Sequence, residues 1–147
     1  GLVAGVPETL QRGLCEAMSL HTRVAFLKAV RAGERVSYGG TWQAPRDTTL
    51  AVVPIGYADG YPRSLSGVAQ VLIGGRRRPL VGRVCMDCAL ADVGPDPDCA
   101  AGDEVVVFGR QGEAEVRISE ISALGRTINQ EIVARMGARL PRVYLDA

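Results

Sequence analysis

Residues 68–85 of the chain read VAQVLIGGRRRPLVGRVC, with a pair of glycines between two runs suited to β-strands. Val68–Ile73 forms the first arm and Arg76–Cys85 the second. Gly74 and Gly75 supply the positive φ angles that a tight two-residue hairpin turn requires. This stretch predicts a β-hairpin and favours a strand-rich fold.

Hydrophobic patterning predicts further strands on both sides of this hairpin. From Leu20 to Phe26 the even positions alternate with polar or small residues, which is typical of a strand with one buried face. Gly33 should then end this segment in a turn. Leu50–Ile55 is a continuous apolar run with Pro54 near its end, as in a buried strand. Short strands are also expected at residues 104–108, 115–118 and 142–145.

One helix is well marked near the end of the chain. Thr127 and Gln130 have the spacing of a capping box, and Gly137 should end the helix. One face of it would carry Ile128, Ile132 and Met136. The fold class is therefore mainly β: a compact β-barrel-like domain of about seven short strands with one or two short helices.

Composition excludes several classes of protein. The 147 residues carry 17 Lys and Arg against 16 Asp and Glu, with 47% hydrophobic and 22% charged residues. These values exclude intrinsic disorder and an extended basic surface for nucleic acid. A chain of this length buries one hydrophobic core, so we expect one domain. It has neither the roughly 20 apolar residues of a membrane span nor a signal-peptide pattern, so we expect a cytoplasmic protein without membrane contact.

Side chains that often carry chemistry are sparse. Cys85 and Cys88 form a Cys-x-x-Cys pair, which can chelate zinc or act as a redox dithiol, but no second pair completes a zinc site. We expect reduced thiols packed near a strand end, and no metal. Lys28, the only lysine, and His21, the only histidine, are interpreted as solvated and structural, respectively. The basic run at residues 76–78 is interpreted as a solvated hairpin strand.

Two tyrosines lie in glycine-rich segments, SYGG at residues 37–40 and GYADG at residues 56–60. Tyr38 and Tyr57 could each be aimed into a cleft with the hydroxyl free. The same pattern also fits a loop aromatic that covers the edge of the core. On these residues alone, the second interpretation is favoured.

Eight short motifs occur in a fixed order along the chain. They are VSYG at 36–39, APRDT at 44–48, VPIGYADGYPR at 53–63, VLIGG at 71–75, VGRVCMD at 81–87, GDEV at 102–105, TIN at 127–129 and PRVY at 141–144. Each motif is weak alone. In this order and spacing, from about Ser19 to Tyr144, they closely resemble the C-terminal β-domain of alanine racemase.

This resemblance implies a bacterial enzyme that interconverts L-alanine and D-alanine for peptidoglycan synthesis with pyridoxal 5'-phosphate. In that family an N-terminal (β/α)₈ barrel carries the cofactor on a lysine. The β-domain of the opposite subunit in a head-to-tail homodimer completes the active site. Residues 1–18 are then the junction from such a barrel, and residues 19–147 are the C-terminal β-domain. The cofactor is not expected on this chain, which should be inactive alone.

The resemblance also assigns site residues. Tyr38 matches the base for the L-enantiomer, on the face opposite the cofactor lysine. Met86 matches the residue whose backbone amide contacts the substrate carboxylate, Asp87 shapes the pocket beside it, and Tyr57 matches a tyrosine at the substrate entrance. Gln130 stands where the family usually has a tyrosine that reaches the cofactor phosphate. Its amide could still donate a hydrogen bond there, although its place in the capping box is the simpler interpretation.

Two other functions stay open from the sequence. The departure at Gln130 is compatible with a broader racemase of the same fold, acting on serine as well. An isolated β-domain could instead serve only as a binding or dimerisation module, with no racemisation and no visible absorbance band on adding pyridoxal phosphate. Racemisation rates on alanine, serine and lysine, together with the length of the native open reading frame, would separate these possibilities.

Overall fold

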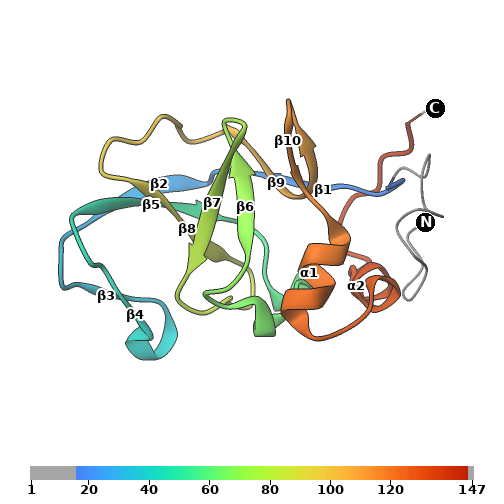
Figure 1. The fold of residues 1–147 in the computed structure, drawn as a ribbon, viewed down its shortest axis with the longest axis horizontal. Coiled ribbons are helices and arrows are strands. Elements are labelled where there is room, and N and C mark those ends of the chain that lie inside the picture. The colour runs from blue at the N-terminus through green and yellow to red at the C-terminus, as the bar shows by residue number, and fades with distance from the viewer. Residues whose placement is uncertain (1–15, 146–147) are drawn as a thin grey trace.

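The structure, a computed structural model, describes residues 16–145, whose strands and helices are drawn in Figure 1. The strands are β1 (Leu20–Arg23), β2 (Phe26–Val30), β3 (Arg35–Val36), β4 (Trp42–Gln43), β5 (Thr48–Val53), β6 (Gln70–Ile73), β7 (Arg76–Val81), β8 (Ala89–Gly94), β9 (Glu104–Gln111) and β10 (Ala114–Val116). The helices are α1 (Ile118–Gly125) and α2 (Asn129–Arg135), and short 3₁₀ turns occupy Tyr38–Gly40, Tyr57–Asp59 and Arg63–Leu65. Most of the expected junction, residues 1–15 with Cys15, lies outside the described residues.

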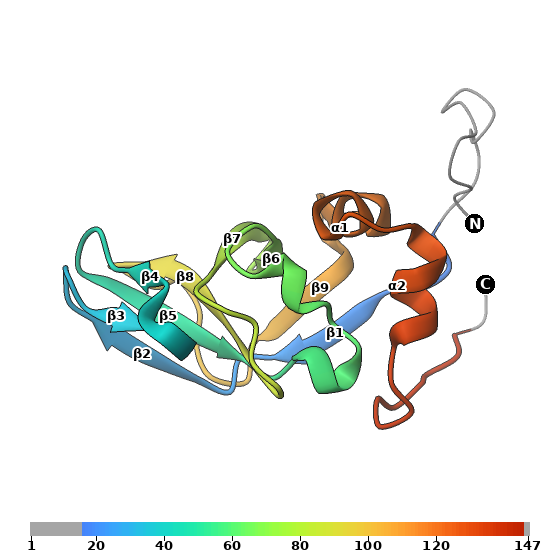
Figure 2. The same ribbon diagram turned by 90° about the horizontal axis from the view of Figure 1, so that it is seen from below.

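The main sheet is antiparallel and curls on itself. Its strand order is β1-β9-β6-β7-β8-β5-β2, with β10 paired to β9. The outermost strands of this order, β1 and β2, are separated in the chain only by Val24 and Ala25. The Val24 amide donates to the Asp103 carbonyl at 2.8 Å, and the Ala25 amide donates to the Val52 carbonyl at 2.9 Å. One continuous segment thus joins both edges of the sheet, as Figure 2 shows, and confirms the predicted barrel-like fold.

Strand β7 also changes partners along its length. Residues from Arg76 to Pro79 pair with β6, whereas Leu80 and Val81 pair with β8. Pro79 has no N–H to donate to a ladder and stands at the point where the pairing changes. Such partner changes turn the sheet around one interior instead of leaving two separate layers.

The interior is filled mainly by apolar side chains from the strands. The largest fully buried ones include Tyr61, Phe108, Leu50, Ile55, Leu65, Leu72, Ile73, Ile121 and Ile132. Helices α1 and α2 pack together at one end of the sheet and contribute the last two of these. Apart from Leu50, these side chains belong to one cluster that is contiguous across sheet and helices, so the loops that leave it start from fixed positions.

A smaller apolar cluster supports the hairpin formed by β3 and β4. Its buried members are Val30, Ala44, Leu50 and Val81, and it packs against the partly buried Val36 and Trp42. Val36 pairs with Trp42 across the hairpin, immediately on either side of the turn that contains Tyr38. Both ends of that turn are therefore held against the core.

The central hairpin is confirmed, but its second arm ends at Val81 instead of Cys85, and the first strand is also corrected. Gly74 and Gly75 have φ angles of +62° and +72°, as the turn requires. The expected strand from Leu20 to Phe26 is interrupted between β1 and β2, because the chain leaves β9 for β5 there. The expected alternation holds for Leu20 and Val24, which are buried, but fails at Phe26, whose side chain is 54% exposed on β2.

Other expected elements near the end of the chain are wrong. Ile118, predicted to end a strand, begins α1 instead, where its side chain is buried beside that of Ile121. Residues 142–145 form no strand in the structure. Strand β8 was not predicted at all. Among residues 16–145, no helix is long and apolar enough to cross a membrane.

The predicted capping box at the start of α2 is also wrong. The helix begins at Asn129 with Ile128 at the N-cap, and no side chain caps it. Arg126 adopts a left-handed conformation at the end of α1, and the Thr127 amide donates to the Ser122 carbonyl. Thr127 thus closes the C-terminal end of α1, and it lies one residue before the N-cap position of α2.

Candidate functional site

Two loops that contain predicted site residues are interlocked through their backbones. The Tyr57 amide donates to the Cys85 carbonyl at 3.1 Å, and the Ala58 amide donates to the Met86 carbonyl at 3.0 Å. A Cβ at Gly56 would lie only 2.2 Å from the Met86 carbonyl oxygen, so this approach requires glycine. The structure therefore brings Tyr57 and Met86 together, although they are far apart in the sequence.

A third loop, which carries Tyr38, is pinned to the same region by Ser37. The Ser37 hydroxyl donates to the Arg83 carbonyl at 2.9 Å and accepts from the Arg83 amide at 3.0 Å. Ser37 itself has φ 64° and ψ 174°, a backbone conformation that costs a non-glycine residue on the order of 1–3 kcal/mol. Strain of this kind persists where the surroundings fix the backbone. The turn that presents Tyr38 is therefore held in place.

The tyrosines in these loops differ in accessibility. Tyr38 is 70% exposed and Tyr57 is 43% exposed, whereas Tyr61 is completely buried. Burial raises the pKa of the Tyr61 hydroxyl well above its usual range, so this phenol stays protonated and out of reach of a ligand. Tyr38 and Tyr57 are the tyrosines here that can meet a substrate, and Tyr38 is the more open of the two.

The turn at residues 85–88 presents polar groups to solvent. The Cys85 amide donates to the Cys88 carbonyl at 2.8 Å, which closes the turn around Met86 and Asp87. Within the described residues, the Met86 amide has no acceptor, and the Met86 side chain is 52% exposed. An open amide N–H on a fixed turn can donate to an anionic group without adding bulk.

Asp87 has a partner that the sequence gave no reason to expect. Arg139 donates from Nη2 to Asp87 Oδ1 and from Nε to Asp59 Oδ1, both at 2.6 Å. These two carboxylates raise the pKa of the Arg139 guanidinium, Asp59 more than Asp87. Arg139 lies 52 residues from Asp87 in the chain, so no local motif could have revealed the pair.

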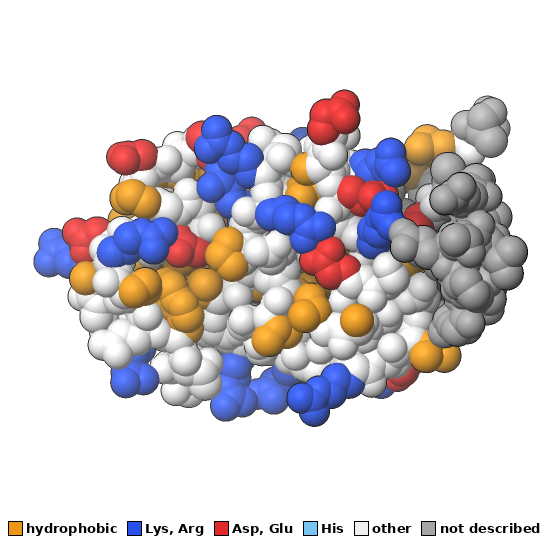
Figure 3. Space-filling model, viewed as in Figure 1, with side chains coloured by type: hydrophobic (Ala, Val, Ile, Leu, Met, Phe, Trp, Pro, Cys, Tyr) orange, Lys and Arg blue, Asp and Glu red, His pale blue; other side chains and the backbone are white. Residues whose placement is uncertain are grey.

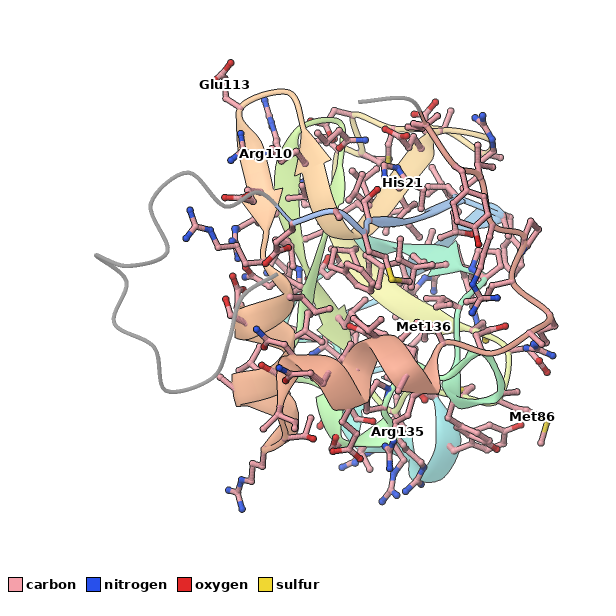
Figure 4. All side chains as sticks on the ribbon, turned by 90° about the vertical axis from the view of Figure 1, so that its right-hand side faces the viewer. His21, Met86, Arg110, Glu113, Arg135 and Met136 are labelled. Atoms are coloured by element: carbon pink, nitrogen blue, oxygen red, sulfur yellow. The ribbon has the colours of Figure 1, made fainter. Side chains whose placement is uncertain are left out.

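An open cleft of about 550 Å³ lies beside Tyr57. Its lining includes Tyr57, Pro62 and Arg63 from one loop and Arg135 from the end of α2. Figure 4 shows Arg135 and Met86 toward the same end of the molecule, both extending outward. The cleft thus adds two cationic side chains to the surroundings of Tyr57.

Gln130 is not brought into this group by any contact. It lies in the first turn of α2 and is exposed, and its side chain makes no hydrogen bond within the described residues. Its amide is free to meet a ligand or another domain. The other four predicted residues belong to loops that are bonded to one another, so Gln130 stands apart.

Cys85 and Cys88 lie at the two ends of the turn at residues 85–88 as free thiols. Burial raises the pKa of the Cys88 thiol, and the neighbouring Cys85 raises it further. Cys85, Cys88 and Cys99 are free thiols. Among residues 16–145, no group of three or more His, Cys, Asp or Glu side chains could hold a metal ion. A thiolate nucleophile is therefore disfavoured at Cys88.

His21 joins a polar network on the outer surface of β1 and β9. Its Nδ1 lies 3.0 Å from Glu104 Oε1, and its Nε2 lies 2.8 Å from the Ser19 hydroxyl. Hydrogen bonds from Gln111 and then from His21 lower the pKa of the Glu104 carboxyl. Figure 4 places His21 well away from Met86. This network ties the strand edges together outside the candidate site.

The basic run on β7 is compensated by carboxylates. Arg76 and Arg78 both pair with Asp98, and Arg77 donates to both oxygens of Glu120 at 2.6 and 2.9 Å. Figure 3 shows basic and acidic side chains interspersed over this face of the molecule. Arg76 and Arg77 therefore act in surface ion pairs, whereas the Arg78 side chain is only 14% exposed, so the interpretation as a solvated strand is wrong for Arg78.

Comparison with known proteins identifies what the loops resemble. A family model described as "Alanine racemase, C-terminal domain" matches residues 17–144. A curated alanine racemase from Mycobacterium avium (strain 104) is 50% identical over 143 residues, which are 97% of this chain and 37% of that protein. This chain thus spans little more than a third of that relative's length.

Solved structures give the same result for the fold. The alanine racemase from D-cycloserine producing Streptomyces lavendulae superposes with a TM-score of 0.90 at 42% identity, over 99% of this chain and 38% of that one. The alanine racemase from Bartonella henselae, solved with covalently bound pyridoxal phosphate, gives a TM-score of 0.79 at 32% identity, over 86% of this chain and 34% of that one. The curled sheet with two terminal helices is therefore the fold found in these racemases.

Proposed function

Because the chain belongs to the family of alanine racemase C-terminal domains, we propose that it is the C-terminal part of an enzyme that interconverts L-alanine and D-alanine. The observation that supports this most directly is the exposed Tyr38 on a strained turn, which is bonded to the segment that leads into Met86 and Asp87. An accessible phenol on a fixed turn, together with a Met86 amide that has no acceptor among the described residues, is suited to a small amino-acid substrate.

Tyr38 is proposed as the base for the L-enantiomer. Racemisation removes the α-proton on one face of the substrate and returns a proton on the other, so it needs a proton-transfer group on each face. As the phenolate, Tyr38 would take the α-proton of L-alanine and become the neutral phenol, which would return a proton in the reverse direction. Ser37 and the β3–β4 hairpin hold its backbone, so the hydroxyl needs no large rearrangement of the turn to reach its position.

Met86, Asp87 and Tyr57 are proposed to bind and orient the substrate. The Met86 amide would donate to the substrate carboxylate, and Asp87 would shape the pocket beside it. Tyr57, on the edge of the open cleft, would narrow the route by which substrate enters. An alanine methyl group leaves little room for extra contacts, so backbone and aromatic groups suit this task.

Pyridoxal 5'-phosphate, when bound, supplies the electron sink that makes the α-proton removable. In the described part of this chain, the candidate contact is Gln130 on α2, and the single lysine, Lys28, lies on β2, a strand that Figure 1 draws at the opposite end of the molecule from α2. They cannot form one cofactor site. We propose that a barrel domain binds the cofactor and that Gln130 contributes a hydrogen bond to its phosphate at most.

The remaining features of the proposal concern assembly. Residues 1–18 would join this domain to the barrel, residues 19–147 would form the C-terminal domain, and a head-to-tail homodimer would bring Tyr38 to the partner's cofactor. The enzyme would act in the bacterial cytoplasm and supply D-alanine for peptidoglycan.

The test compares the 147-residue chain with the complete polypeptide, meaning this domain together with the proposed barrel. The complete polypeptide should racemise L-alanine and should prefer it to serine and lysine, whereas the chain alone should be inactive and should gain no visible absorbance with pyridoxal phosphate. Equal rates on the three amino acids would contradict alanine specificity. Cofactor attachment at Lys28 of the chain alone would contradict the division between domains.

A further inference from the structure

Asp59 is a buried carboxylate at the base of the loop that carries Tyr57. Its side chain is only 8% exposed, and its Oδ2 accepts the Gly56 amide at 2.8 Å. A carboxylate this deep is costly unless it is paired and hydrogen-bonded. Arg139 supplies the pairing charge through Nε, 2.6 Å from Asp59 Oδ1. The loop and Arg139 are therefore fixed together by one buried group.

The chain segment that carries Arg139 is itself locked onto this loop. The Gly137 amide donates to the Asp59 carbonyl at 2.8 Å. Gly60 has φ +99°, and a Cβ there would lie 2.0 Å from the Arg135 carbonyl oxygen. The end of α2 thus packs against the Gly56–Gly60 turn through backbone contact, and the root of the Arg139 side chain cannot shift independently.

The free end of the Arg139 guanidinium reaches the substrate turn. Its Nη2 lies 2.6 Å from Asp87 Oδ1, and the Asp87 side chain is 62% exposed. An ordinary exposed ion pair orders neither partner, because both side chains are mobile. Here one partner is anchored by Asp59, and the planar guanidinium fixes the direction of its second donor. The buried Asp59 therefore fixes the Arg139 guanidinium, which in turn restricts the exposed Asp87 side chain.

We propose that Arg139 is a positioning residue for this site, which fixes Asp87 and through it the Met86 amide that receives the substrate carboxylate. The inference rests on the proposed racemase function for its effect on catalysis. Its structural part, the anchoring of residues 85–88 by Asp59 and Arg139, is independent of that function. Arg139 would touch neither substrate nor cofactor and would act through Asp87.

The kinetic test uses Arg139→Gln, Arg139→Lys and Asp87→Asn in the complete polypeptide. Misplacing an orienting group costs up to about a hundredfold, so kcat/KM for L-alanine should fall by roughly 10- to 100-fold in Arg139→Gln, mostly through KM. Arg139→Lys should lower kcat/KM less than Arg139→Gln does, since lysine keeps the positive charge but lacks the planar guanidinium that donates to both carboxylates. Asp87→Asn combined with Arg139→Gln should lose no more than the worse single variant.

Arg110 provides the matched control, because it is an arginine paired with a glutamate at 3.0 Å on the side of the molecule away from Met86 in Figure 4. Arg110→Gln should leave KM unchanged. Equal kinetics for Arg139→Gln and wild type would overturn the proposal, and so would additive losses in the double variant. If Arg139→Gln fails to fold, Asp87→Asn alone still tests the outer half of the bridge.

Hydrogen exchange in the 147-residue chain tests the anchoring by Arg139 separately from the proposed racemase function. The amides of Tyr57 and Ala58 donate to carbonyls of the substrate turn, so they should exchange faster in Arg139→Gln and in Asp87→Asn than in wild type or Arg110→Gln. Unchanged exchange would overturn the positioning role. Faster exchange together with an inactive wild-type complete polypeptide would instead reject the racemase function and leave the anchoring intact.

Discussion

Gly82 is the position where a single methyl group should disturb the turn that carries Tyr38. It has φ +68°, and a Cβ there would lie 2.6 Å from the Ser37 Cβ, closer than such atoms approach in proteins. Ser37 cannot retreat easily, because its hydroxyl is bonded to both the amide and the carbonyl of Arg83. Gly82→Ala should therefore strain its own backbone and also push on Ser37.

Gly74→Ala is the control that has the backbone strain of a positive φ without the clash of the added methyl group. Its φ of +62° is nearly the same, and a Cβ there would meet nothing within 4 Å. A left-handed conformation costs alanine about 1–2 kcal/mol, of which the lower entropy of the unfolded chain offsets about 0.4–1 kcal/mol. Gly74→Ala should thus lose about 0–1.6 kcal/mol. Gly82→Ala should lose about 1–3 kcal/mol more, the usual cost of overpacking.

Urea denaturation of the 147-residue chain and both variants measures this difference. The m-values should agree, so the change in midpoint reports stability alone. In the complete polypeptide, Gly82→Ala should also lower racemase activity, whereas Gly74→Ala should not. Free energies of unfolding for the two variants within about 0.5 kcal/mol of each other would refute the reasoning, because surface substitutions differ by that much without any specific contact.

Two further predictions concern the sheet and its core. Because hydrogen bonds from Gln111 and His21 lower the pKa of Glu104, its ionised form stabilises the fold above the ordinary carboxyl pKa, and this contribution is lost as pH falls through the lower folded-state value. Glu104→Gln should therefore lose less stability than wild type in urea titrations between about pH 5 and pH 3, whereas Glu113→Gln at the exposed hairpin tip should follow wild type. Phe108→Ala should cost about 3–5 kcal/mol in thermal or urea unfolding, since its ring is fully buried. A cost under about 1 kcal/mol, equal to that of Phe26→Ala with its half-exposed ring, would contradict the placement of the core.

The parts of the fold that sequence could predict are those set by local chemistry. The Gly74-Gly75 turn follows from the φ angles glycine allows, and the buried strand β5 follows from a continuous apolar run ended by Pro54. Partner changes are set by distant strands, so the break at Val24 and Ala25 left no local mark. The change of partner along β7, from β6 up to Pro79 to β8 from Leu80, is likewise set by distant strands.

In the candidate site too, local motifs could be predicted from the sequence, whereas contacts between distant loops could not. The motifs around Tyr38, Tyr57 and Met86 could be matched from the sequence, and the structure joins their loops through Ser37 and Gly56. The positive φ of Ser37 could not be foreseen, because serine does not favour it and tertiary contacts impose it. The Arg139 bridge could not be foreseen either, since its two partners come from different loops.

The central claim is that this domain supplies the base on the L-alanine face of a racemase. It is tested most directly by exchange of the α-hydrogen of L-alanine in D₂O, catalysed by the complete polypeptide with Tyr38 or with Tyr38→Phe. Loss of a general base costs about 10²–10⁴-fold, so exchange from L-alanine should fall at least about a hundredfold, while exchange from D-alanine, on the opposite face, should fall much less. Exchange from L-alanine at the wild-type rate in Tyr38→Phe would contradict the claim.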